Sequence, residues 1–260
     1  MTIVHTRLGL LVAATLGCAG TAHADSIING GFETGDFTGW STTGITVTSY
    51  TAVPPPSGNY QAALGTSRPT EAASSASAMA AVLGVTVGDI SGVITGQGPA
   101  KNQDGTFYAA SSSTTVFSGS AIAQTVNNIN AGDTLSFDWH FLSFDWAESW
   151  WNDTAFFTIT NLTTNTTEVI HLADTFSGLV ASPTTAFAYE LAAGYQSFEY
   201  IFGAGGDYRI GFGVINVGDD TFQSGLLLDN ISITAIPLPA PAWIGLAGLA
   251  GVVVMHRRRV

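Results

Sequence analysis

Hydrophobic and polar residues alternate along much of the middle of this chain. The alternation has period two in residues 135–141, 198–202 and 208–214, and it is looser in residues 155–159. Because successive side chains of a strand point to opposite faces of its sheet, this period predicts half-buried β-strands. Within the first of these stretches, Trp139 falls on the hydrophobic face and is expected in the core.

Clusters of Asn, Gly, Asp and Thr separate the predicted strands. They occupy residues 130–133, 161–167, 203–207 and 218–220, and such clusters are typical of turns. The strands do not alternate with helical segments. The pattern therefore predicts an all-β fold, an antiparallel β-sandwich of the jelly-roll type formed by two packed sheets.

One segment departs from the strand pattern. Residues 71–83 are rich in Ala and Ser, and Met79, Val82 and Leu83 recur at helical spacing. The segment predicts one short helix inserted between early strands.

The N-terminus has the layout of a secretory signal peptide. Arg7 precedes an apolar run over residues 8–19, and small residues precede Asp25. This order predicts a signal helix in residues 1–24 with cleavage after Ala24. The alternative is a lipoprotein signal acylated at Cys18. Cleavage after Ala24 removes the only Cys, so we expect a mature protein without disulfides or thiolate metal sites.

The C-terminus predicts a membrane-spanning helix over about residues 240–256. An apolar run lies between a Pro-rich segment and terminal arginines. As a helix, residues 240–255 span roughly 24 Å, slightly less than the hydrocarbon core. The arginines are expected on the cytoplasmic side, with the preceding domain outside the membrane. An ordinary tail anchor is one interpretation of this segment.

Residues 236–260 also resemble the PEP-CTERM protein-sorting signal, in which a Pro-rich motif, a short apolar helix and a basic end follow one another. Leu238 stands where that motif usually has Glu. The resemblance implies recognition and cleavage by an exosortase-type membrane protease of a Gram-negative bacterium. The protein would then be transiently anchored and finally reside at the cell surface or in the extracellular matrix. The residues that carry the resemblance are Pro237, Leu238, Pro239, Arg257, Arg258 and Arg259.

Charge separates the ends of the chain from its middle. The chain has 7 Lys and Arg against 19 Asp and Glu, a net charge of -12. Residues 25–235 keep only Arg68, Lys101 and Arg209 while all 19 acids remain, so the net charge of this predicted domain is -16. Nucleic acid is excluded as a partner because phosphate binding needs clustered cations. An acidic surface instead attracts divalent cations.

The two ends of the predicted domain carry recognisable sequence patterns. Residues 29–40 read NGGFETGDFTGW, and residues 228–233 read LDNISI. The pair resembles the galactose-binding-like jelly rolls found in many carbohydrate-binding modules. That resemblance implies neighbouring terminal segments with a structural Ca²⁺ between them, held by Glu33 and Asp229 and by backbone carbonyls. The alternative is that both carboxylates bond to turn amides.

An aromatic cluster provides the candidate ligand site. Trp146, Trp150 and Trp151 lie among acidic residues in the segment 144–153, between two predicted strands. A loop at the rim of a rigid sandwich is a usual place for binding, and a sugar ring stacks on an aromatic face. The alternative is that these Trp side chains cover an open end of the core.

Catalysis has weaker support from the sequence. Asp145, Glu148 and Asp153 are acids of the same segment, and glycoside hydrolysis needs two facing carboxylates. We expect a non-enzymatic, exported surface or exopolysaccharide-matrix protein with a structural or adhesive module. The alternative is a carbohydrate-binding module that uses the tryptophans to bind extracellular polysaccharide, and a secreted glycan hydrolase ranks last.

Overall fold

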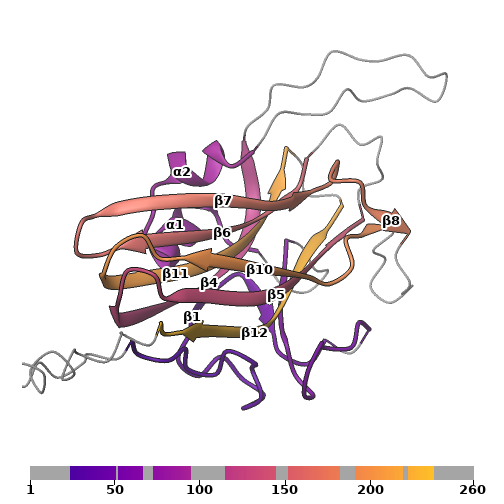
Figure 1. Cartoon of the computed structure of the whole chain (residues 1–260). Helices are drawn as coiled ribbons and strands as arrows, with labels where there is room; N and C mark the ends of the chain where they lie inside the picture. The colour runs from indigo at the N-terminus through magenta and orange to yellow at the C-terminus, as the bar shows by residue number, and fades with distance from the viewer. Residues whose placement is uncertain are drawn as a thin grey trace, which may run out of the picture.

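The chain folds into two antiparallel β-sheets packed face to face, with two short helices, in the part that the structure describes (Figure 1). This confirms the predicted all-β sandwich of the jelly-roll type. No helix within that part is long and apolar enough to cross a bilayer. The structure is a computed structural model that describes residues 24–50, 52–66, 73–94, 115–144, 152–181, 191–218 and 222–236. The predicted signal peptide, up to residue 23, and the predicted sorting signal, from Pro237 onward, lie outside the described residues.

The described strands divide between two sheets. The first contains, in spatial order, β1 (Ser41–Thr43), β4 (Val116–Ile129), β11 (Gly206–Val217), β6 (Thr154–Asn161) and β7 (Thr166–Asp174). The second contains β2 (Ile45–Val47), β3 (Ala62–Gly65), β12 (Ser224–Thr234), β5 (Thr134–Ser143), β9 (Leu191–Ala192) and β8 (Val180–Ala181), with β10 (Gln196–Ile201) also paired to β5. Among the described strands, β7 pairs only with β6 and β10 only with β5, so both are edge strands.

Four phenylalanines join the sheets at the centre of the sandwich. Phe137 of β5 contacts Phe157 of β6 and Phe212 of β11, with ring centroids 5.3 and 4.8 Å apart in edge-to-face geometry. Phe198 of β10 stacks on Phe137 at 5.4 Å. Burying each ring contributes roughly 2–3 kcal/mol to the free energy of unfolding, so this cluster is a principal source of stability.

The prediction that Trp139 lies in the core is also confirmed. Trp139 and Phe141 of β5 are buried between the sheets. Trp40 is buried beneath the opening segment, where its ring lies 5.6 Å from Phe32 and its indole N–H donates to the carbonyl of Asn29 at 3.3 Å. The period of two thus placed Trp139 and Phe141 on the correct side of the chain.

The inserted helix begins later than the sequence predicts. Helix α1 covers Ala76–Leu83, with Ser75 as its N-cap. The backbone of Ser74 pairs instead with Gly119 of β4, through two hydrogen bonds of 2.8 and 2.9 Å. These bonds hold residue 74 in an extended conformation, so the helix cannot start before Ser75.

Helix α1 lies directly on the outer face of the first sheet. A Cβ on Gly119 would lie 2.6 Å from the sulfur of Met79, and one on Gly211 would lie 2.5 Å from a methyl of Leu83. The sheet therefore presents glycine where the helix packs. A second helix, α2 (Val87–Gly92), was not predicted; it starts with a capping box between Thr86 and Asp89.

The opening and closing segments of the domain lie side by side. The amide of Ile231 in β12 donates to the carbonyl of Gly30 at 3.0 Å, and a Cβ on Gly30 would lie 1.9 Å from the carbonyl oxygen of Ile231. Asn230 has a left-handed φ of 54° at a register shift of β12. The predicted proximity is confirmed. However, the opening segment 29–40 consists of turns, and the first strand starts only at Ser41.

Candidate functional site

A cavity of about 330 Å³ opens where the edge strands β7 and β10 approach each other. The β6–β7 turn and the turn between β10 and β11 close one end of it. Its volume lies at the lower end of the range for small-molecule sites, about 300–1,000 Å³. The polar and aromatic side chains in its wall are Asn161, Thr164, Thr166, Glu168, Tyr200 and Tyr208.

Asn161 fixes the β6–β7 turn that forms one wall of this cavity. Its side-chain oxygen accepts hydrogen bonds from the amides of Thr163 and Thr164 at 2.9 and 3.0 Å. The amide of Leu162 donates to the carbonyl of Asp207 at 2.8 Å, which ties the turn to the start of β11. This is the usual turn chemistry of Asn, and it makes the wall part of the rigid sandwich.

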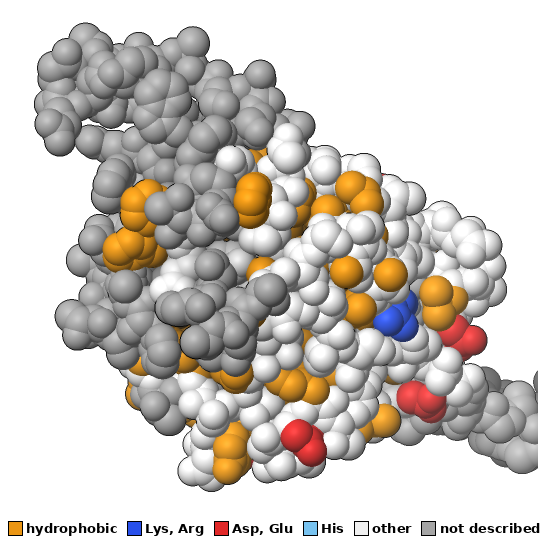
Figure 2. Space-filling view, turned by 180° about the vertical axis from the view of Figure 1, so that it is seen from behind, with side chains coloured by type: hydrophobic (Ala, Val, Ile, Leu, Met, Phe, Trp, Pro, Cys, Tyr) orange, Lys and Arg blue, Asp and Glu red, His pale blue; other side chains and the backbone are white. Residues whose placement is uncertain are grey.

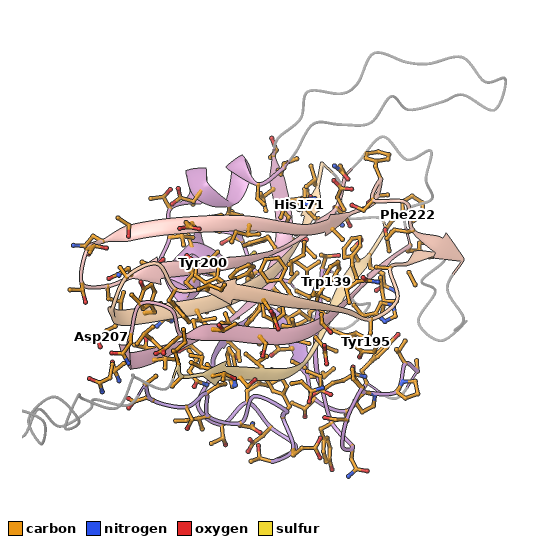
Figure 3. All side chains as sticks on the ribbon, in the orientation of Figure 1. Trp139, His171, Tyr195, Tyr200, Asp207 and Phe222 are labelled. Atoms are coloured by element: carbon orange, nitrogen blue, oxygen red, sulfur yellow. The ribbon has the colours of Figure 1, made fainter. Side chains whose placement is uncertain are left out.

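Tyrosine rings form the aromatic part of the wall. Tyr208 is buried and donates its hydroxyl to the carbonyl of Ala204 at 2.7 Å. Its ring contacts Phe202 at 4.8 Å, and Tyr200 contacts the same Phe202 at 5.5 Å, both edge to face. Tyr200 is half-buried, so part of its ring is accessible from the cavity. Figure 3 shows Tyr200 at the same end of the sandwich as Asp207.

Tyr200 and Glu168 connect the two sheets across the cavity. The Tyr200 hydroxyl donates to Glu168 Oε1 at 3.2 Å. Burial and the charge of Glu168 raise the pKa of Tyr200 to about 12, so the phenol keeps its proton at neutral pH. Glu168 is exposed, and it is the only carboxylate among the described residues that line the cavity.

Cations are scarce around this site. Arg209 follows Tyr208 but points toward α1, where its Nε donates to the carbonyl of Val82 at 2.6 Å. On the face opposite to that of Figure 1, charged side chains are likewise few among the described residues (Figure 2). Polar uncharged groups, one carboxylate and aromatic rings therefore define the chemistry of the cavity.

Among the sequence-predicted site residues, the structure brings Glu33 and Asp229 to the same turn. Glu33 accepts hydrogen bonds from the amides of Asn59 and Tyr60, each at 3.0 Å. Asp229 is buried and accepts from the amide of Ser57 at 3.1 Å. Both carboxylates thus hold the turn 57–60 against the closing strand. These bonds are the turn-amide arrangement that the sequence left open as an alternative.

The fit of calcium to these residues follows from their hydrogen bonds. Burial raises the pKa of Asp229, and the charges of Glu33 and Asp138 raise it further. A cation here would relieve that repulsion. However, calcium takes six to eight oxygen ligands, and the described residues contain no group of three acidic, His or Cys side chains suited to a metal. Because backbone amides of the turn 57–60 donate hydrogen bonds to both carboxylates, Glu33 and Asp229 do not form a ready calcium site in this arrangement. A bound calcium stays a prediction.

The tryptophan site stays a prediction because Trp146, Trp150 and Trp151 lie outside the described residues. The neighbouring acid Asp153 is described, and it is not part of a solvated rim. It is fully buried just before β6, and its Oδ1 accepts the amide of Val217 at 2.9 Å. Its bond to the backbone of β11 gives no support to a hydrolytic carboxylate pair, the alternative that the sequence ranked last.

Sequence reasoning missed the pair formed by Tyr200 and Glu168. Tyr200 lies within the strand that the period of two predicted, and Glu168 follows the predicted turn 161–167. The missing step was the pairing of strands. The pattern assigns faces to side chains but does not say that β7 and β10 are edges facing each other.

No family model and no curated protein matches this chain. Solved structures of similar architecture include a CBM61 module in complex with β-1,4-galactotriose, with 12% identity over 82% of this chain and 99% of that one, at a TM-score of 0.41. A CBM28 module specific for non-crystalline cellulose gives 11% identity, coverage of 82% and 96%, and a TM-score of 0.38. The xylan-binding CBM22-1 domain of Paenibacillus barcinonensis Xyn10C has 10% identity over 83% of this chain and 97% of that one, at a TM-score of 0.36. Each similarity is confined to the general sandwich architecture.

Proposed function

We propose that this chain is an exported, non-enzymatic binding module whose β-sandwich attaches to extracellular polysaccharide through the cavity between β7 and β10. One observation carries the proposal. A half-buried Tyr200 ring, hydrogen-bonded to Glu168, forms the wall of a cavity of about 330 Å³ that also presents Asn and Thr side chains. Sugars combine apolar ring faces with a rim of hydroxyls, and this wall offers a partner for each.

The aromatic wall supports sugar stacking. Tyr200 rests on Phe202, and Phe157 lies 6.0 Å away on its inner side. These contacts restrict the ring, so little side-chain entropy is lost when a ligand binds. The size of the cavity suits a short stretch of polymer, about one or two sugar rings.

The polar wall supports orientation of the sugar. Thr164 and Thr166 share a hydrogen bond of 2.8 Å between their hydroxyls, and both line the cavity. Each hydroxyl has acceptor and donor capacity beyond that one bond. Glu168 adds a carboxylate acceptor for sugar hydroxyls. Polar groups of this kind, held on a rigid turn, fix the direction of a bound ring.

A non-enzymatic role agrees with the chemistry of the cavity. Hydrolysis of a glycosidic bond needs two carboxylates about 5–9 Å apart across the bond. Within the described lining, Glu168 has no carboxylate partner. The cavity therefore suits retention of a polymer better than its cleavage.

Export and sorting form the cellular part of the proposal, and the sequence supports them. A signal peptide over residues 1–24 and the PEP-CTERM-like segment 236–260 would carry the domain through the inner membrane to an exosortase-type protease, and then to the surface or matrix. Mass spectrometry of the C-terminus, in cells with and without the exosortase, tests this route. A mature end at Val260 in both strains contradicts it.

The tryptophans of residues 146, 150 and 151 are the second candidate platform of the same function, favoured by their position between β5 and β6 in the sequence. Glycan-array binding of the full-length chain separates the two platforms. We expect Tyr200→Ala to abolish binding. Loss in Trp150→Ala alone would move the site to the tryptophan segment, and no binding to any glycan would leave a purely structural or adhesive module.

A further inference from the structure

Resting on the glycan-binding function proposed above, we propose that the cavity between β7 and β10 selects an amino sugar with a free, protonated amine, and that Glu168 recognises this amine beside the ring of Tyr200. The ligand class is a polymer that contains deacetylated amino sugars, as opposed to a neutral or a uronic-acid polymer.

Glu168 has the position that such recognition requires. It is exposed on β7, and it lines the cavity. Its Oε1 accepts the hydroxyl of Tyr200, whereas its Oε2 has no bonded partner among the described residues. One carboxylate oxygen is thus held in place and the other is available to a ligand.

The described surroundings of Glu168 contain no competing cation. No ion pair reaches it within the described part of the chain, and the described Arg209 is bonded to Val82 and Thr125 on the side of α1. An ammonium group that enters the cavity would therefore meet an uncompensated carboxylate. Charge-assisted hydrogen bonds of this type are shorter and stronger than neutral ones.

The hydroxyl of Tyr200 positions the carboxylate for the same ligand. It donates to Oε1 at 3.2 Å, so Oε2 is the oxygen that an amine can reach. The carboxylate distinguishes a charged amine from the amide of an acetylated sugar, because acetylation removes the charge.

The charge of the domain disfavours the opposite class. Residues 25–235 have a net charge of -16, and no described residue of the cavity wall is cationic. Such a potential repels uronic acids and raises the local concentration of cationic sugars. We therefore expect cationic sugars to be favoured twice, by long-range attraction to the acidic surface and by direct contact with Glu168.

The test measures affinities of the full-length chain for short β-1,4-linked glucosamine oligomers, their N-acetylated counterparts and galacturonate oligomers of equal length. We expect glucosamine oligomers to bind at least about fivefold more tightly than the acetylated ones, and galacturonate to bind weakest. The substitution Glu168→Gln should remove that preference, so that glucosamine oligomers and acetylated oligomers bind with equal affinity.

Glu199→Gln is the matched control. Glu199 is exposed on neighbouring β10, pairs in register with Ser136, and does not line the cavity. Its substitution changes the net charge by the same amount and should keep the preference. Equal losses in Glu199→Gln and Glu168→Gln would show unspecific attraction by the acidic surface and overturn the proposal.

The remaining outcomes separate this inference from the function on which it rests. Equal affinity of the unsubstituted chain for free and acetylated oligomers overturns amine selection and leaves the glycan-binding function intact. Absence of binding to every oligomer overturns the function itself, and the inference with it. Because both substituted side chains are exposed, unchanged thermal melting of each variant confirms that folding is unaffected.

Discussion

The hydroxyl of Tyr200 lies 3.2 Å from Glu168 Oε1 and thereby joins edge strand β10 of one sheet to edge strand β7 of the other. Exposed edges invite pairing with further strands, and proteins commonly cover them with loops or charges. Here the edges instead frame a cavity with an aromatic and a carboxylate wall. The proposed binding site thus uses the open side of the sandwich.

Glu33 is predicted to stabilise the domain through the turn 57–60. Glu33→Ala removes the acceptor of the amides of Asn59 and Tyr60, and we expect a loss of about 1–2 kcal/mol in the free energy of unfolding. Urea denaturation measures it. Glu199→Ala, which removes an exposed carboxylate without such bonds, is the control and should change little. A loss of equal size in both variants would contradict the role of the turn.

Calcium is tested at Asp229 by thermal melting. Because burial and the charges of Glu33 and Asp138 raise the pKa of Asp229, a cation bound there would stabilise the ionised folded state. A structural calcium held by Glu33 and Asp229 would raise the melting temperature by several degrees relative to EDTA, since a ligand that binds only the native state adds about 2.7 kcal/mol at 100 times its Kd. Asp229→Asn should abolish the difference. The prediction is wrong if melting is unchanged and the purified protein contains no metal.

Asp174 is predicted to contribute to acid stability. Burial acts to raise its pKa, but hydrogen bonds from His171, Ser177 and Asn152 outweigh burial and hold the pKa at about 2. Because this folded pKa is below the ordinary 3.8, the stabilisation is present above pH 3.8 and is lost as the pH falls towards 2. Asp174→Asn should lower the free energy of unfolding by about 1 kcal/mol at neutral pH. The free energy of unfolding of the variant should also fall less steeply as the pH is lowered from 3.8 towards 2. Denaturation curves from pH 6 to 2 measure it, and parallel curves for both proteins would contradict it.

His140 is predicted to oppose folding in mild acid. It is buried, its ring lies 5.0 Å from that of Tyr195, and neither ring nitrogen has a hydrogen-bond partner among the described residues. Burial lowers its pKa from 6.5 to about 4. The unfolded chain therefore binds the proton more readily, and stability declines as the pH falls from 6.5 towards 4.

The substitution His140→Leu tests this decline. It should leave stability at pH 7 equal or about 1 kcal/mol higher, because unpaired buried nitrogens are removed. At pH 4 the gain should reach roughly 2–3 kcal/mol. Urea midpoints at both pH values measure the gain, and the same difference at each pH would show that His140 does not titrate with folding.

The sequence predicted the fold well where local pattern decides it. The period of two placed Phe137 and Phe212 toward a common core because strand geometry alone fixes which side of the chain they occupy. The start of α1 was not predictable in the same way. The Ala and Ser composition continues upstream of Ser75. The helix does not start earlier because Ser74 pairs with Gly119, which is distant in the sequence.

The candidate site was less predictable because distant segments build it. Tyr200 and Glu168 are 32 positions apart, and their meeting depends on which strands occupy the sheet edges. Asp153 is a second residue whose surroundings the sequence did not predict. Its acidic neighbourhood in the sequence suggested a solvated loop, but its bond to Val217 buries it. Spacing along the chain does not reveal partners that lie so far apart in the sequence.

The position at which a sugar binds is the most direct test of the proposed site. A crystal structure of the full-length chain with its tightest-binding oligomer measures this. We predict a sugar ring packed against Tyr200 in the cavity between β7 and β10, with a hydroxyl or amine bonded to Glu168. A ring bound instead on the tryptophans of residues 146–151 or on another surface, with this cavity filled only by water, would contradict the account.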